Sequence, residues 1–247
     1  MSEVVAHVKA LWRYPVKSMA GEPLEAAELD WAGIPGDRRF AWVQSENPSG
    51  FPWLTIREIS DLVRYVPRLL DPHRPELSRV EVTTPEGEAV ALEDLRERLA
   101  ERHGAPVHLL RSARGLFDAF PLSVLSLGTV RSLRDVTGVA IDARRFRPNV
   151  VVETVTGEPH EEDRWIGGTL RFGAGARVRL DERDERCVIT NVDPDTAERD
   201  PRVLREIAQR RAACTGVYGS IEVPGPVAVG DPVTFSAGTS DGGSGAP

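Results

Sequence analysis

Cys187 is the residue best placed by its neighbours to do chemistry. It follows the charged run DERDER and precedes the apolar string VIT. Thiolates are soft metal ligands, and a cation such as Arg186 beside a cysteine favours the ionised form. The apolar residues predict a strand over CVITNVD that begins at the cysteine. From these residues alone, a buried structural cysteine is the favoured alternative, and Cys214 is interpreted as packing.

Basic residues form a second candidate site, because they recur in short strings punctuated by Pro and Gly. They are Lys17 and Ser18 in YPVKS, Arg38 and Arg39 in GDRRF, and Arg144, Arg145, Arg147 and Asn149 in RRFRPN. Guanidinium groups bind phosphate through two parallel hydrogen bonds, and lysine adds a point charge. We expect a few of these side chains to converge on a local anion pocket, although each one alone is more often a solvated surface charge.

A third candidate is the string SVLSLGTV, which follows an apolar strand and opens a predicted helix. It contains Ser123, Ser126, Gly128 and Thr129. Free N–H groups at the start of a helix can bind an anion. The alternative is an ordinary helix cap, for which Ser126 is sufficient.

Other metal and acid–base patterns are weak. The string HEEDRW, His160 to Trp165, has carboxylates at no spacing that fixes a ligand set, and we interpret it as a solvated turn with Trp165 in the core. The five histidines are dispersed, without HExxH or triad spacing. Two cysteines exclude an all-cysteine iron–sulfur cluster or a four-thiolate zinc site within one chain.

Composition limits the class of protein. The chain has 247 residues, 28% charged and 40% hydrophobic, with a formal net charge of −7, which is typical of a soluble globular protein. No global positive field is available for nucleic acid or an anionic membrane, and no apolar run approaches the ~20 residues needed to cross a bilayer. With two cysteines and no secretory signal, we expect a reduced, cytoplasmic protein.

The elements that must position these residues are mostly short strands. Alternating or apolar runs predict strands within 4–16, 23–33, 37–50, 79–92, 147–154, 168–173, 176–182, 187–193, 219–223 and 231–237. Helices are predicted over 92–104, 127–138 and 200–213, the last with an Asp-Pro start. We therefore predict a mainly β fold with a few helices (α+β). No GxGxxG or GxxxxGK[ST] loop occurs, which argues against a nucleotide-binding α/β fold.

Eight strings in this order resemble one family. They are YPVKSMAG, GIPGDRRFAWV, LTIRE, PLSVLSLGTVRSL, RRFRPNVVV, EEDRWIGGTLRFG, RCVITNVDPDT and GVYGSIEVPGPVAVGDPV. Over residues 4–236 the chain resembles a MOSC protein (molybdenum cofactor sulfurase C-terminal domain) preceded by a MOSC N-terminal β-barrel domain. The pattern is most similar to the mitochondrial amidoxime-reducing components and their bacterial relatives.

The resemblance implies a fold and a domain order. We expect a MOSC-type β-barrel packed with an N-terminal β-barrel domain, with the N-terminal domain over 1–90, the MOSC domain over 91–237 and a disordered tail over 238–247. The change from the first β region falls within residues 85–115.

The resemblance also implies site residues. Cys187 is expected to be the molybdenum ligand and the catalytic residue. The cofactor-binding residues are expected to be Lys17, Ser18, Arg38, Ser126, Gly128, Thr129, Arg147, Asn149, Arg186 and Tyr218. Glu185 stands where similar proteins tend to have a small or polar residue.

The implied function is reduction of N-hydroxylated small molecules at a molybdenum cofactor (Mo-molybdopterin), with electrons from a separate ferredoxin-, cytochrome- or flavin-type protein. Pyridoxal phosphate binding is a further association at family level only. No nucleic acid or membrane partner is expected. Two alternatives stay open: a sulfur-transfer or cofactor-carrier protein that uses Cys187 as persulfide or ligand, and a β-barrel that binds a small anion or a partner and has a structural cysteine.

Overall fold

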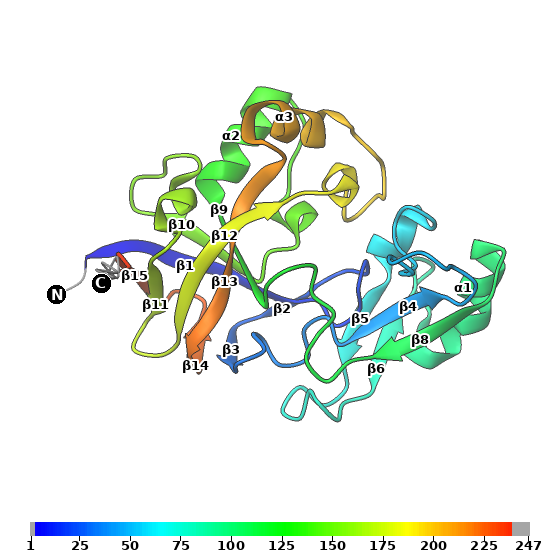
Figure 1. Ribbon diagram of the computed structural model, residues 1–247. Coiled ribbons are helices and arrows are strands. Elements are labelled where there is room, and N and C mark those ends of the chain that lie inside the picture. The colour runs from blue at the N-terminus through cyan, green and yellow to red at the C-terminus, as the bar shows by residue number, and fades with distance from the viewer. Residues whose placement is uncertain (1–2, 239–247) are drawn as a thin grey trace, which may run out of the picture.

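A closed β-barrel is the central feature of the computed structural model, which describes residues 3–238 (Figure 1). Its seven strands run in the order β10–β9–β13–β12–β11–β15–β1, and β1 pairs with β10 to close the ring. Their bounds are β1 (Val4–Arg13), β9 (Leu122–Ser126), β10 (Val150–Thr154), β11 (Thr169–Phe172), β12 (Arg177–Glu185), β13 (Cys214–Val223) and β15 (Pro232–Ser236). The predicted mainly β fold is confirmed.

A second β-rich unit lies beside the barrel, at the right of Figure 1. It contains the pair β4–β8, the three-stranded sheet β5–β6–β7 and helix α1. The bounds are β4 (Phe40–Gln44), β5 (Val66–Leu69), β6 (Val80–Thr83), β7 (Ala89–Ala91), α1 (Leu95–His103) and β8 (Val107–Arg111). Short strands β2 (Glu22–Leu24), β3 (Ala26–Leu29) and β14 (Gly225–Ala228) add pairings at the barrel's edge.

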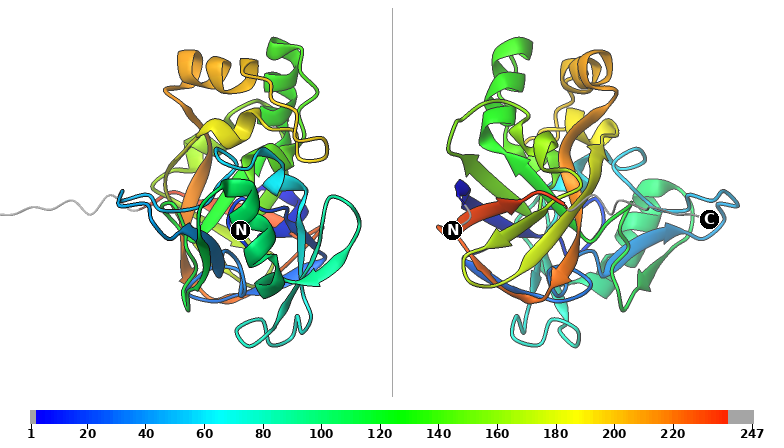
Figure 2. Two further views of the ribbon diagram at one scale, coloured as in Figure 1. Left: turned by 90° about the vertical axis from the view of Figure 1, so that its right-hand side faces the viewer. Right: turned by 60° about the vertical axis from the view of Figure 1, so that its left-hand side comes forward.

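Two helices cover one end of the barrel, where Figure 2 shows them side by side. They are α2 (Leu127–Thr137) and α3 (Arg202–Arg211), and they share a small apolar core that includes Leu133 and Ile207. With α1, these helices confirm the predictions over 92–104, 127–138 and 200–213. None of the helices in the described part of the chain is long and apolar enough to cross a membrane.

One segment connects the two large hydrophobic cores. Val8 and Leu11, on β1, are buried in the barrel core, whereas Val16 and Met19 belong to the core of the second unit. The chain thus leaves one core and enters the other within a few residues, which places Lys17 and neighbouring Ser18 at the junction of the two units. The boundary near residue 90 stays a prediction, and residues 239–247 of the predicted tail lie outside the described residues.

The predicted strand over CVITNVD is wrong. Strand β12 ends at Glu185, and Val188–Asn191 form the 3-10 helix η5. Thr190 Oγ1 donates to the Cys187 carbonyl at 3.0 Å, and the Asn191 side chain accepts from the Leu204 amide at 2.9 Å. Such local side-chain bonds replace the hydrogen bonds of a strand ladder.

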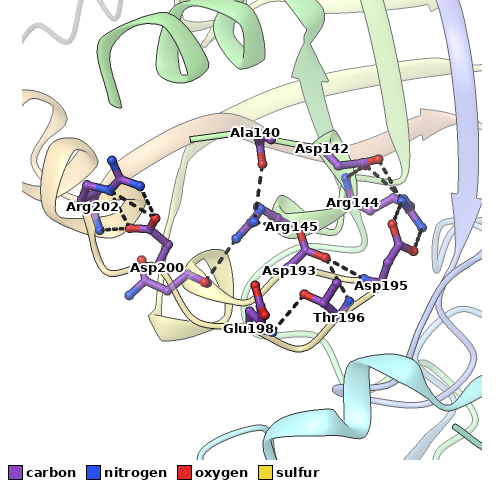
Figure 3. A network of polar contacts seen from close by, with 11 residues as sticks. Ala140, Asp142, Arg144, Arg145, Asp193, Asp195, Thr196, Glu198, Asp200 and Arg202 are labelled. Atoms are coloured by element: carbon purple, nitrogen blue, oxygen red, sulfur yellow. Dashed lines mark hydrogen bonds and ion pairs between the residues drawn. The ribbon is translucent and has the colours of Figure 1, made fainter. Parts of the chain in front are cut away.

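An arginine–aspartate network holds the segment after η5 against the barrel (Figure 3). Arg145, with 5% of its surface exposed, donates to the Asn191 carbonyl at 3.2 Å and to Asp193 at 2.9 Å. The neighbouring Arg144 binds Asp142 and Asp195 at a more exposed position. The network links the 3-10 helix η3 (Ala143–Phe146), which leads to Arg147, with the segment that follows Cys187.

We expect Arg145→Met to destabilise the fold by about 2–3 kcal/mol, because it removes the side-chain donor of Asp193 Oδ2 and of the Asn191 carbonyl. Arg144→Met, at the exposed position, should cost less than about 1 kcal/mol. Urea denaturation of both variants measures the difference. Equal losses would show that burial of the Arg145 guanidinium does not set its contribution.

Candidate functional site

A cavity of about 370 Å³ lies between the barrel and the second unit, with walls from both. It brings together seven of the residues predicted from the sequence, namely Lys17, Ser18, Arg38, Arg147, Arg186, Cys187 and Tyr218. We call it the junction cavity. Glu185, whose role the sequence leaves open, also lines it.

Cys187 is exposed and lines the junction cavity between the end of β12 and η5. The alternative of a buried structural cysteine is therefore wrong. Arg186 does not act as expected: its guanidinium is 2.7 Å from Asp184 and donates to the Phe146 carbonyl at 2.6 Å. Its charge is balanced by Asp184 rather than left free for the Cys187 sulfur.

The basic side of the cavity begins with Lys17. Its Nζ is 2.5 Å from Asp118 Oδ1. Burial lowers the pKa of Lys17, although Asp118 opposes this shift. Burial alone would raise the pKa of Asp118, but Lys17 brings it below its usual value, with smaller effects of Arg38 and Arg147. The pairing therefore favours the charged form of both groups.

Two guanidinium groups continue the basic side and share one aromatic ring. The ring of Tyr14 lies 5.0 Å from the guanidinium carbon of Arg38 and 4.3 Å from that of Arg147. Arg38 also binds Asp37 and the Arg147 carbonyl, the latter at 3.0 Å. Arg147 donates to the Met19 carbonyl but forms no ion pair with a carboxylate of the described residues. Burial, with repulsion from Arg38, lowers its pKa to about 10.

Three of the predicted cofactor-binding residues have left-handed backbones. The φ angles are 66° at Ser18, 48° at Arg38 and 51° at Arg147. For residues other than glycine this region is costly, and such strain tends to occur at functional sites. All three residues line the junction cavity, whereas the other non-glycine residues with positive φ in the described part of the chain do not, namely His160, Ala197, Ala212 and Ala213.

The acidic part of the cavity lining comes mainly from β12. Glu182, Asp184 and Glu185 line the cavity here, together with Tyr218 of β13. Asp184 is 1% exposed and accepts from Ser123 Oγ at 2.8 Å, while its Oδ1 has no hydrogen-bond partner among the described residues. Burial raises the pKa of Asp184 to about 6 despite the nearby Arg186. The junction cavity therefore carries both charge signs in its lining, with Asp118 beside Lys17 and Arg186 beside Asp184.

Asn149 lies behind the cavity rather than in its wall. It is 1% exposed, and its Nδ2 donates to Asp37 at 3.1 Å and to the Trp12 carbonyl at 3.2 Å. Its Oδ1 accepts from the Ser123 amide at 3.1 Å. Asn149 thus supports Arg38 through Asp37, and its Oδ1 also accepts directly from Arg38 Nη1 at 3.4 Å.

The structure does not bring Ser126, Gly128 or Thr129 to the junction cavity. Ser126 caps α2 by accepting from the Thr129 amide at 3.1 Å, and the buried Glu162 accepts from Thr129 Oγ1 at 3.0 Å. The alternative of an ordinary cap describes this loop, whose groups are already bonded.

HEEDRW is not a solvated turn, because Glu162 is fully buried beneath the helix. Trp165 is in the core as expected.

Other arginines of the basic strings lie elsewhere: Arg39 donates to the Ser112 carbonyl, and Arg144 and Arg145 belong to the network of Figure 3.

Sequence reasoning missed Asp118 and Asp184 as cavity residues. Asp184 belongs to the run DERDER directly before Cys187. Because side chains alternate between the two faces of a strand, this run could have indicated a carboxylate in the cavity. Nothing local distinguishes Asp118, because its pairing with Lys17 joins distant parts of the chain.

Two family matches cover the chain. The MOSC domain matches residues 100–234, and the MOSC N-terminal beta barrel domain matches residues 5–115. The chain therefore belongs to the MOSC domain family.

Similar proteins agree with this assignment. The human (Homo sapiens) mitochondrial amidoxime-reducing component 1 is 26% identical, in a match that covers 93% of this chain and 82% of that protein. The mouse (Mus musculus) protein of that name is 30% identical, but the match covers only 47% of this chain and 36% of the mouse protein. The crystal structure of the YUAD protein from Bacillus subtilis has a TM-score of 0.51 at 16% identity, covering 95% of this chain and 98% of that one, which supports the fold.

Gly128→Ala tests whether this glycine is structural. An added Cβ would lie 2.6 Å from the Glu158 carbonyl oxygen and 2.8 Å from that of Gly157. We expect a loss of about 1–3 kcal/mol in the free energy of unfolding, despite the ~1 kcal/mol that alanine gains in a helix. Gly50→Ala, which meets no atom within 4 Å, is the control. A neutral Gly128→Ala in urea denaturation would contradict this close approach.

Asp184 should make stability depend on pH between about 4 and 6. Its pKa is about 6 in the folded chain, above its ordinary value of 3.8, so in this range the folded chain binds more protons than the unfolded chain. Its contribution is therefore present below about pH 4 and is lost as the pH rises through 6. Relative to Asp184→Asn, the wild-type free energy of unfolding should fall more steeply, by at most about 1.4 kcal/mol per pH unit. Parallel pH profiles would contradict this pKa.

Proposed function

We propose that this MOSC-family chain is a molybdenum-cofactor-dependent oxidoreductase that reduces N-hydroxylated small molecules of the amidoxime type. A separate electron-transfer protein would supply the electrons. The single observation that supports the proposal best is the exposed Cys187 in one cavity with Lys17, Arg38 and Arg147. The names of the amidoxime-reducing relatives supply the reaction class, and a cytoplasmic location stays a prediction.

The cavity fits such a cofactor in size and chemistry. Its volume of about 370 Å³ lies within the range of small-molecule sites. Lys17, Ser18 and Arg147 offer cations and a hydroxyl to a phosphate and a polar heterocycle. Among residues 3–238, no group of three or more His, Cys, Asp or Glu could hold a metal ion. A metal at Cys187 would therefore need further ligands from the cofactor itself.

When bound, the cofactor would supply the two-electron redox chemistry. The chain would position it through Arg38 and Arg147, whose guanidinium groups are held by Asp37, by backbone carbonyls and by the ring of Tyr14. Because the pKa of Arg147 is about 10, the group remains charged at neutral pH and lacks a carboxylate partner that a phosphate would have to displace.

The same cavity offers a proton donor for the proposed reaction. Converting an N–OH group to N–H and water takes two electrons and two protons. Asp184, with a pKa of about 6, is mostly ionised and paired with Arg186 at neutral pH, but a minor protonated fraction can donate, and the residue lines the cavity together with Tyr218. A general acid works best when its pKa is near the operating pH. We assign Asp184 as the group that would protonate the leaving oxygen.

A carrier or sulfur-transfer protein is the second candidate, because the exposed Cys187 is also accessible to a partner's sulfur. In that case the chain would bind the cofactor, or bear a persulfide, without reducing a substrate. Molybdenum content and reduction of benzamidoxime by an artificial electron donor, measured on one preparation, distinguish the two. Bound molybdenum without turnover favours the carrier.

Cys187→Ala should abolish benzamidoxime reduction and leave the thermal unfolding midpoint within about 2 °C of wild type, because its side chain is exposed. Cys214→Ala is the matched control, since its sulfur donates to the Ala212 carbonyl at 3.4 Å and Cys214 is not among the residues that line the cavity. We expect this control to keep wild-type turnover.

Protein made in a cofactor-competent host should be used, and molybdenum should be measured by mass spectrometry. Reductase activity in Cys187→Ala that matches wild type per bound molybdenum would overturn the assigned role of this sulfur.

A further inference from the structure

A second cavity, of about 400 Å³, adjoins the junction cavity, with which it shares Arg147 and Ile189. Its remaining walls come from β1, β2, the loop between β6 and β7, and the segments around Arg64, Arg144 and Asp195. We propose that this second cavity binds a small aromatic anion, a ring that carries a carboxylate or a phosphate. The site adjoins the proposed cofactor position, with which it shares Arg147, and does not require molybdenum.

The walls favour a flat apolar body. Trp12 and Tyr14 contribute aromatic rings, and Val63, Ile189 and Val192 contribute aliphatic surface. Three prolines complete the apolar lining, at positions 23, 85 and 194. The volume exceeds what one ring needs and lies in the range of small-molecule sites.

The charges favour an anion. Arg64 and Arg147 line the cavity and form no ion pair with any carboxylate of the described residues. The other two arginines of the lining are already neutralised, Arg144 by Asp142 and Asp195, and Arg145 by Asp193. Arg64 therefore offers its charge to a ligand of this cavity alone, and Arg147, which also lines the junction cavity, is available to the ligand when no cofactor is bound. Guanidinium groups bind carboxylate and phosphate with matched geometry.

Tyr14 supplies an independent indication. This residue is 1% exposed, and its hydroxyl has no hydrogen-bond partner among residues 3–238. Buried polar groups are normally bonded, so an unpartnered hydroxyl in a cavity wall indicates a missing acceptor. Burial raises the pKa of Tyr14, so the hydroxyl keeps its proton and can donate. Gly21 leaves room for the ring here, because a Cβ would lie 2.5 Å from Tyr14 Cε1.

Isothermal titration of the full chain, purified without molybdenum, tests the proposal with four probes. Phenyl phosphate and benzoate carry ring and charge, benzamide carries the ring alone, and inorganic phosphate carries the charge alone. We expect one molecule of phenyl phosphate or benzoate per chain, bound at least ten-fold more tightly than either of the other two. A preference for phenyl phosphate or for benzoate identifies which anion the site takes. Absence of saturable binding for both, or equal binding of benzamide, overturns the proposal.

Three charge-reversal variants locate the probe. Arg64→Glu should weaken binding at least ten-fold, and Arg64→Gln should weaken it less. Arg57→Glu changes the junction cavity alone, and Arg74→Glu changes an exposed arginine outside both cavities. Both should bind within two-fold of wild type.

Loss of binding in Arg57→Glu with retention in Arg64→Glu would place the probe in the junction cavity and overturn the second site. Because the protein contains no molybdenum in this experiment, failure here leaves the proposed reductase function untouched. Melting curves by circular dichroism confirm that each variant is folded before titration.

Discussion

The buried carboxylate of Asp37 holds together the parts of the chain on which the site depends. It accepts a hydrogen bond from the Tyr14 amide at 2.6 Å and another from Asn149 Nδ2 at 3.1 Å, and it pairs with Arg38. These partners come from the end of β1, from the start of β10 and from the second unit. An unpaired buried carboxylate costs folding free energy, and these three interactions form only when all three segments are in place together. The interactions around Asp37 hold Arg38 in place, and its left-handed backbone conformation therefore persists.

Local sequence patterns were sufficient to predict helices and strands and part of the site. The helix over 127–138 has a serine cap and a terminal glycine, and both do in the structure what their types predict. Lys17, Arg38 and Cys187 were identifiable because chemistry-bearing residues stand out in their strings. The family resemblance was needed to connect them, since their convergence arises from packing between the barrel and the second unit. No local sequence pattern predicts the contact between the barrel and the second unit.

The failures have a common physical cause. η5 replaces a predicted strand because Thr190 and Asn191 bond to nearby backbone, and apolar periodicity does not register such bonds. Ser126 was predicted to bind the cofactor. Its amide instead donates to Glu162, which is distant in the sequence. Arg186 was expected to act on its neighbour Cys187, yet it turns to a carboxylate two residues before it. In each case a side chain has a partner that the apolar and charged patterns of the sequence do not predict.

The closure of the barrel by β1 limits how freely its two family segments can be separated. The MOSC match begins at residue 100, but the ring needs Val4–Arg13 to join β15 to β10. A fragment that lacked this strand would present two unpaired sheet edges to solvent, the geometry that promotes self-association. The two segments are thus interlocked rather than modular, and recombining either one with a foreign neighbour would have to bring the first strand along.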